Sequence, residues 1–174
     1  MSESPAGPAP DEPLVDQGSW ARFTPSLERL LDGQGQSSGS GAQEVVLIAP
    51  LPVIDAQDLP RARGLGDLLR RRAALPSPEA PRVVLAVRAI GVEVRLPGHD
   101  DQGRALLGRA QRSALQALGW QGAESLTRTD PDPLHAAEAV TRVLIEVLRV
   151  AHPADLECRA VPMAHGAQAA RPSA

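Results

Sequence analysis

Residues 82–96, RVVLAVRAIGVEVRL, decide the fold class, because they contain two β-type runs separated at Gly91. In the second run, valine and leucine alternate with Glu93 and Arg95, the pattern of an antiparallel strand with one face in water. In the first run, residues 82–90, both faces are largely apolar. One face carries Val83, Leu85 and Val87, and the other carries Val84, Ala86, Ile90 and Arg88. That strand is either central and covered on both faces, or it keeps an apolar face for a partner.

The clearest helical pattern follows nearer the C-terminus. Asp132 suits the N-cap position of a helix, and Pro133 suits its first position. Apolar residues then recur at helical spacing until Pro153 forbids continuation. The pattern predicts a helix over residues 133–151, with His152 in its last turn as a partner of the helix dipole.

A second helix precedes this one and has a well-marked end. Asp100 or Asp101 can cap its start, and an apolar stripe follows. Gly119 supplies the left-handed backbone position that ends many helices, and Trp120 then folds back on the last turn. Residues 121–129, between the two helices, give no clear pattern.

A further helix is predicted near the N-terminus. Apolar residues recur at helical spacing within residues 20–31, and Gly33 stands just past them as a stop. Pro25 leaves two possibilities open. Either Thr24 caps a short helix that begins at Pro25, or a helix that begins at Ser19 tolerates a kink there.

Two short β-type runs complete the pattern, at residues 44–50 and 156–160. The order along the chain is helix, strand, insertion, two strands, helix, an unassigned stretch, helix and strand. Long helices grouped with antiparallel-type strands are typical of the α+β class. We therefore predict a small antiparallel sheet packed against helices.

The elements belong to a single expected domain, residues 17–161. Residues 1–16 form a Pro-rich leader and residues 162–174 a tail, and both are too polar and too rich in small residues for a core. We expect both to be disordered. Inside the domain, residues 34–42 are expected to form a mobile linker, and residues 51–81 an insertion.

Composition argues against several classes of protein. All 18 basic residues are arginine and there are 21 acidic residues, so a net charge of -3 gives no general reason to expect nucleic acid or a membrane as a partner. Residues 1–13 lack the apolar core of a signal peptide, and no run approaches the ~20 apolar residues that span a bilayer. The single cysteine, Cys158, excludes an intrachain disulfide and suggests a small buried hydrophobe. These observations predict a cytoplasmic protein.

Motifs of catalysis and of anion binding are weak in this chain. Residues 35–39, GQSSG, match the nucleophile-elbow pattern, but they lie in the expected linker with no strand before them. Residues 70–72, three arginines, could bind phosphate, yet no aromatic residue accompanies them, so a solvated face is favoured. We predict no catalytic residue and no cofactor.

Histidines and carboxylates give no metal site either. His99 stands beside Asp100 and Asp101, but helix capping already accounts for the two aspartates. The other histidines share no ligand spacing: His135, His152 and His165. We therefore predict no bound metal.

Several of the features above occur together in one known family. They are Trp20, Phe23, Leu27 and Leu30; an apolar strand followed by the strand at residues 92–94; Leu118-Gly119-Trp120; and Leu148-Arg149-Val150 with Pro153, Asp155 and Leu156. In this order and spacing, they resemble the TY-Chap family, which is related to YbjN and to type III secretion chaperones and is common in actinobacteria. The resemblance implies helices against a curved antiparallel sheet, and binding of peptides or partner proteins without catalysis. It also implies a homodimer, which is usual among type III secretion chaperones.

The leading hypothesis is a non-catalytic, chaperone-like module that presents an apolar sheet surface to an extended segment of a protein or peptide client. Its candidate contact residues are Val84, Ala86 and Arg88 on the second face of the 82–90 strand, together with Trp120. Both tryptophans are more often core anchors than contacts. The alternative is a structural homodimer or adaptor, whose apolar surface is used in self-association and which has no client.

Overall fold

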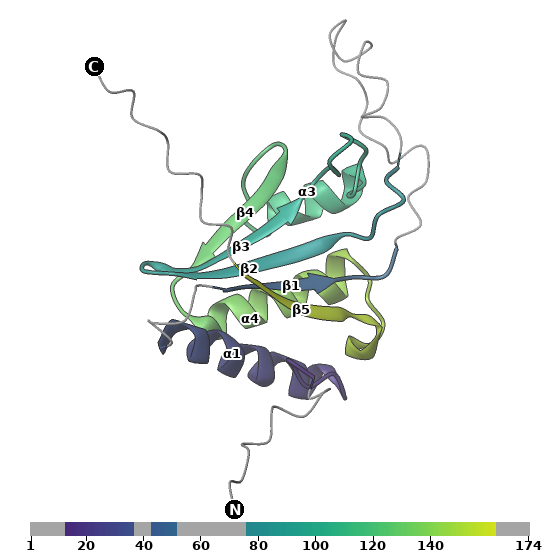
Figure 1. Ribbon diagram of the computed structural model, residues 1–174. Helices are drawn as coiled ribbons and strands as arrows, with labels where there is room; N and C mark the ends of the chain where they lie inside the picture. The colour runs from purple at the N-terminus through teal and green to yellow at the C-terminus, as the bar shows by residue number, and fades with distance from the viewer. Residues whose placement is uncertain (1–12, 37–42, 52–75, 163–174) are drawn as a thin grey trace, which may run out of the picture.

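The computed structural model describes residues 13–36, 43–51 and 76–162. Its centre is an antiparallel sheet with the strand order β4-β3-β2-β1-β5 (Figure 1). The strands are β1 (Gln43–Ile48), β2 (Arg82–Arg88), β3 (Gly91–Pro97), β4 (Ser125–Asp130) and β5 (Glu157–Pro162). The predicted α+β class is confirmed, and the first strand of the 82–96 stretch lies at the centre of the sheet.

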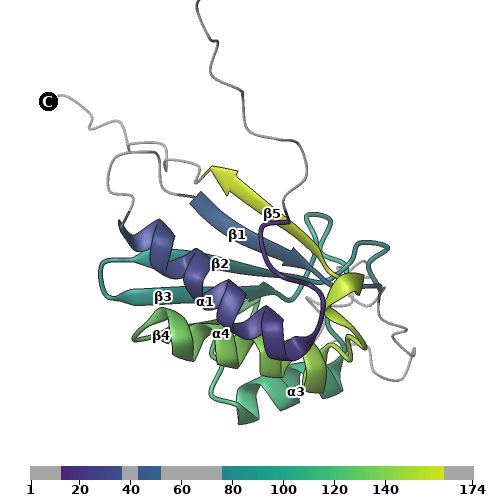
Figure 2. The same ribbon diagram turned by 90° about the horizontal axis from the view of Figure 1, so that it is seen from below.

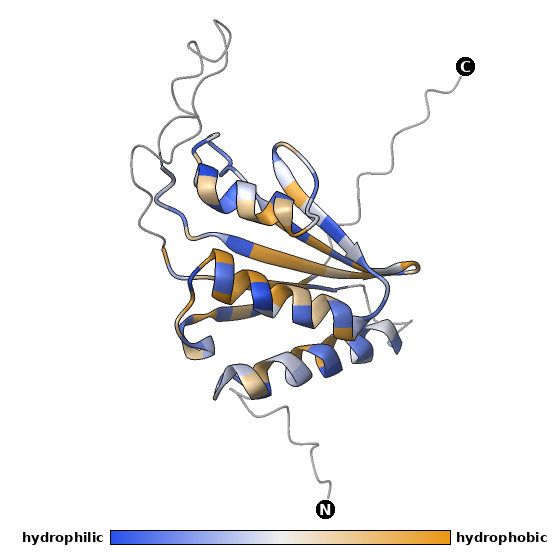
Figure 3. Ribbon diagram, turned by 180° about the vertical axis from the view of Figure 1, so that it is seen from behind, coloured by the Kyte–Doolittle hydropathy of each residue, from blue (hydrophilic) through white to orange (hydrophobic). Residues whose placement is uncertain are grey.

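One face of the sheet carries the hydrophobic core. On that face Leu47, Leu85 and Val94 are fully buried, as are their neighbours at alternate positions. All three described α-helices lie on this side of the sheet (Figure 2). They are α1 (Trp20–Gln36), α3 (Arg109–Ala117) and α4 (Pro133–Arg142). Figure 3, seen from the helix side, shows hydrophobic residues concentrated along the central strands behind these helices. The described residues therefore form two layers, with their α-helices on one face of the sheet.

Helix α1 resolves the two possibilities at Pro25. It begins at Trp20 and passes through Pro25, and the carbonyl of Ser19 accepts a hydrogen bond from the N–H of Phe23 at 2.8 Å. Proline inside a helix costs about 3 kcal/mol. That cost is offset because one side of the helix is fully buried in the core, at Phe23, Leu27 and Leu31.

The predicted stop at Gly33 is wrong. Helix α1 continues to Gln36, whose Nε2 donates to Asp32 Oδ2 at 3.0 Å. A single glycine costs a helix only about 1 kcal/mol, so it weakens the helix without ending it. Residues 34–36 of the expected linker are therefore helical, and residues 37–42 lie outside the described part of the chain.

The predicted start of the next helix is also wrong. Helix α3 begins at Arg109, after Gly108, and neither Asp100 nor Asp101 caps it. The carboxylate of Asp100 instead holds a tight turn, where it accepts hydrogen bonds from the N–H of Gln102 at 2.9 Å and of Arg104 at 2.7 Å. The residues between this turn and the helix are buried: Ala105, Leu106 and Leu107.

The predicted end of α3 is confirmed. Gly119 has a φ of +87°, and its N–H donates to the carbonyl of Gln116 at 3.0 Å. The N–H of Trp120 donates to the carbonyl of Leu115 at 3.0 Å, which completes the glycine-terminated helix end. Trp120 is 2% exposed and belongs to the core, as expected for an anchor.

Helix α4 begins as predicted but ends early. Asp132 accepts the N–H of His135 at 2.9 Å, and Pro133 is the first helical residue. The helix then widens into a π-turn, η3 (Val143–Val147), and Arg149 adopts a left-handed φ of +57°. The chain therefore leaves the helix at Arg149, four residues before Pro153.

The prediction that His152 lies in the last turn of the long helix is wrong. Pro153 opens a 3-10 turn, η4 (Pro153–Asp155), instead of closing a helix. His152 caps that turn, since its Nδ1 accepts the N–H of Ala154 at 3.1 Å. The last strand, β5, then starts at Glu157, one residue later than predicted, and the unassigned stretch after Trp120 contains all of β4 except Asp130.

Candidate functional site

The face of the sheet opposite the helices is the candidate site, and we call it the open face. None of the described helices covers it (Figure 1). Read across the sheet from β5 to β4, its first row is Val161, Glu44, Ala86, Glu93 and Thr129, and its second row is Arg159, Val46, Val84, Arg95 and Thr127. Beyond these rows, Glu157, Ile48 and Arg82 form a row on β5, β1 and β2, and Pro97 of β3 pairs with Ser125 of β4. Apolar side chains thus cluster on β1 and β2, with charged and hydroxyl residues on both sides.

Three of the four predicted contact residues lie together on the open face. Val84 is 9% exposed, Ala86 is fully buried, and Arg88 is exposed at the end of β2. Trp120 is not with them, because it lies in the core on the helix side. The sequence pattern of β2 placed the first three correctly on one face, since residues at alternate positions of a strand share a face.

Charged side chains from the neighbouring strands cover Val84 and Ala86. Arg95 of β3 forms an ion pair with Glu44 of β1, across the intervening β2. Arg95 Nε also lies 3.7 Å from Glu93 Oε1, and Arg88 Nε lies 3.2 Å from Glu93 Oε2. These four residues, Glu44, Arg88, Glu93 and Arg95, form what we call the charge ladder. β2 alone looks apolar, but its neighbours place a polar cover over it.

Sequence reasoning missed three apolar members of the open face. Val46 and Ile48 of β1 are half-buried there, and Val161 of β5 is 40% exposed. The signal for Val46 and Ile48 was present, since the 44–50 run is apolar at alternate positions. Val161 was missed because the predicted strand ended one residue before it.

The two edges of the sheet differ. At β4, Gln121 and Thr127 exchange backbone hydrogen bonds of 3.0 and 2.7 Å, so part of that edge is closed. At β5, no residue of the described chain pairs with the outer edge. Two oppositely charged side chains, Glu157 and Arg159, lie along this edge on the open face, with Arg159 Nε 2.6 Å from Glu157 Oε1. β5 therefore offers unpaired backbone groups to an added strand.

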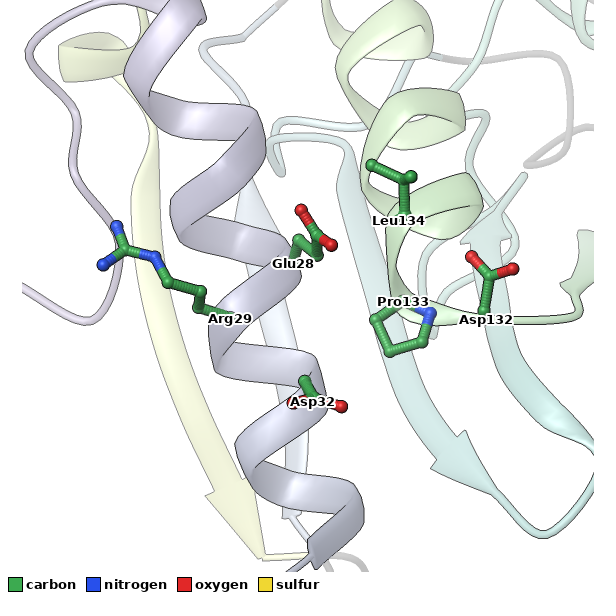
Figure 4. Close-up of a pocket in the computed structure, with 6 residues that line it drawn as sticks. All are labelled: Glu28, Arg29, Asp32, Asp132, Pro133 and Leu134. Atoms are coloured by element: carbon green, nitrogen blue, oxygen red, sulfur yellow. The ribbon is translucent and has the colours of Figure 1, made fainter.

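A small pocket lies on the helix side, between α1 and the start of α4 (Figure 4). Glu28 and Asp32 lie on α1 across from Pro133, Leu134 and Asp132 at the start of α4 (Figure 4). Asp132 is already engaged: hydrogen bonds from the backbone and ring of His135 lower its pKa, and the same carboxylate raises the pKa of His135. The pocket holds carboxylates but no nucleophile with a neighbouring base, which gives it no evident chemistry.

The remaining candidate residues form no reactive group. Burial lowers the pKa of His99, and Asp100 is committed to its turn. Burial likewise raises the pKa of Cys158, which is half-buried at the edge of the core. In the described residues no group of three or more metal-ligating side chains converges. Other candidates lie outside the described chain: residues 37–39 of GQSSG, the arginines at 70–72, and His165.

No helix in the described ranges is long and apolar enough to cross a membrane. Comparison with protein families matches residues 66–162 to TY-Chap3, described as T3SS (YopN, CesT) and YbjN peptide-binding chaperone 3. The match spans more than half of the 174 residues and includes every described element from β2 to β5. No curated protein and no solved structure matched the chain. The chain belongs to the TY-Chap3 family of peptide-binding chaperones.

Proposed function

We propose that the protein is a non-catalytic chaperone of the cytoplasm that holds an extended segment of a client protein on its open face. One observation carries the proposal: the described helices all pack on one side of the sheet and leave an apolar cluster on the other (Figure 1). That cluster is Val46, Ile48, Val84 and Val161. Client binding also agrees with the peptide-binding description of the family.

The charge ladder is compatible with binding at Val84 and Ala86. Its ion pairs are partly exposed, and exposed ion pairs contribute only about 0–1 kcal/mol each. A client can therefore displace Arg95 or Glu93 at small cost and reach the apolar residues beneath. Arg88, at the exposed end of the ladder, can pair with a client carboxylate. Trp120 enters the proposal only as a core residue that supports the sheet.

The proposal is tested by placing a charge on the open face and, as a control, on the helix side. Val161 and Ile145 suit this comparison because they are 40% and 38% exposed and lie on opposite layers. We expect Val161→Asp to weaken binding of an unfolded client about tenfold, because the variant loses an apolar contact and would bury a charge against the client. Ile145→Asp should leave binding unchanged.

Binding is measured by anisotropy of a labelled, chemically unfolded model protein, and both variants are checked for an unaltered melting curve. Equal loss in the two variants, or no loss in Val161→Asp, contradicts the placement on the open face. The molar mass in solution tests the alternative function. A tight dimer that binds no unfolded chain would indicate a structural homodimer without a client.

A further inference from the structure

We infer that the outer edge of β5 receives an extended client segment with the pattern acidic, apolar, basic, read from its N-terminus. This inference rests on the proposed function and names the partner's chemistry. The outer edge has no partner strand in the described residues, so its backbone groups can extend the ladder that β5 forms with β1. Pro162 lacks an N–H, so the pairing stretch is residues 157–161.

Charge sets the first and third positions of the client segment. Glu157 and Arg159 lie two residues apart on the open face and are both more than half exposed. An antiparallel strand places one residue opposite Arg159 and, two residues later, another opposite Glu157. Opposite charges in such cross-strand pairs are favourable, and like charges are unfavourable. The client residue opposite Arg159 is therefore acidic, and the residue opposite Glu157 is basic.

The middle residue of the client segment lies opposite Cys158. Its side chain therefore points to the helix side of the sheet. An open groove lies next to Gln17, whose side chain contacts Cys158. It is lined by the segment that leads into α1, by α1 itself and by the start of η4, including Leu14, Gln17, Leu30 and His152. Gln17 connects the groove to β5, since its Nε2 donates to the carbonyl of Leu156 at 2.7 Å and lies 3.3 Å from Cys158 Sγ. Figure 2 shows the segment that leads into α1 running beside β5. Leu14 is an exposed apolar residue in the groove, so an apolar client side chain fits the middle position.

Two labelled nine-residue peptides of identical composition test the pattern: one with Glu-Leu-Arg at its centre and one with Arg-Leu-Glu, both flanked by threonines. We expect the wild-type protein to bind the first about tenfold more tightly, because two cross-strand charge pairs change sign between them. The double variant Glu157→Arg/Arg159→Glu keeps the net charge and should invert the preference. A third peptide, with Glu-Ser-Arg at its centre, should bind the wild type more weakly than Glu-Leu-Arg.

Equal binding of the two charged peptides, or a preference that survives the double variant, overturns the inference while leaving the proposed function to its own test at Val161. Failure of every peptide to bind also overturns it. The strand β5 itself reads Glu157-Cys158-Arg159, so a second copy of this chain could pair at the same edge. Sedimentation at the assay concentration should show a monomer. A dimer that is lost in Arg159→Glu and regained in the double variant would assign the edge to self-association instead.

Discussion

Replacing Gly91 with alanine is expected to lower the free energy of unfolding by about 3 kcal/mol or more. Gly91 opens β3 with a φ of +132°, a conformation that residues with a side chain rarely adopt. A Cβ there would lie 2.2 Å from the carbonyl oxygen of Asp130, a backbone atom of β4. The strain and the overlap together would push β3 away from β4. Urea unfolding followed by circular dichroism measures the change.

Gly103→Ala provides the matched control. Gly103 also has a positive φ, +76°, but a Cβ there meets no atom within 4 Å. We expect it to cost only about 1–2 kcal/mol, the price of a left-handed residue alone. If Gly91→Ala is no more destabilised than Gly103→Ala, the close approach of β3 to Asp130 is wrong.

Replacing Asp100 with asparagine is expected to lower the melting temperature at neutral pH by roughly 5–10 °C. The carboxylate is buried in its turn and accepts four hydrogen bonds, two of them at Oδ2 from Ser77 Oγ at 2.7 Å and Arg104 Nε at 2.6 Å. Asparagine replaces one acceptor oxygen with a donor and removes the charge that Arg104 needs. The exposed neighbour is the control, and Asp101→Asn should melt like the wild type.

The effect at Asp100 depends on pH in a defined direction. Burial by itself would raise the pKa of Asp100, but hydrogen bonds from Ser77, Arg104 and Gln102 outweigh it and hold the pKa well below its usual value. A depressed pKa in the folded state stabilises the protein above the unfolded-state pKa of about 3.9. The difference in melting temperature between wild type and Asp100→Asn should therefore be constant above about pH 5 and shrink as the pH falls below about 4. A difference that grows on acidification would contradict this role.

The local sequence predicted parts of this fold reliably at positions where a single residue strongly favours one backbone conformation. Asp132 and Pro133 start α4 as expected, and Gly119 ends α3 as expected. Each of these residues favours its own conformation strongly, so little depends on the distant chain. The errors came where tertiary packing outweighed a weaker local preference. Burial on one side carried α1 through Pro25 and past Gly33.

The error at Asp100 has the same cause, whereas the early end of the last helix had no signal in the local sequence. Asp100 looked like a helix cap, but buried residues after it and a contact with Ser77, distant in the sequence, turned it into the anchor of a tight turn. Arg149, just after the π-turn that follows α4, has a left-handed conformation that its residue type does not predict. The π-turn before it also has no signal in the local sequence.

The open face could be predicted only in part. Alternation within β2 correctly grouped Val84, Ala86 and Arg88, but it could not show that Glu44 and Arg95 approach from two other strands and cover them. The order of strands decides this, and strand order depends on pairing between distant segments. The family match also shows how far apart neighbouring strands lie in the sequence. The matched residues include β2 and β5 but not β1, which lies between them in the sheet.

Amide hydrogen exchange with and without a bound extended client tests the central claim most directly. The unpaired outer edge of β5 should exchange rapidly in the free protein, and client binding should slow exchange within residues 157–161 while leaving α1 and α4 unchanged. Slowed exchange in the two helices with no change in β5 would contradict the account, because it would place the client on the helix side.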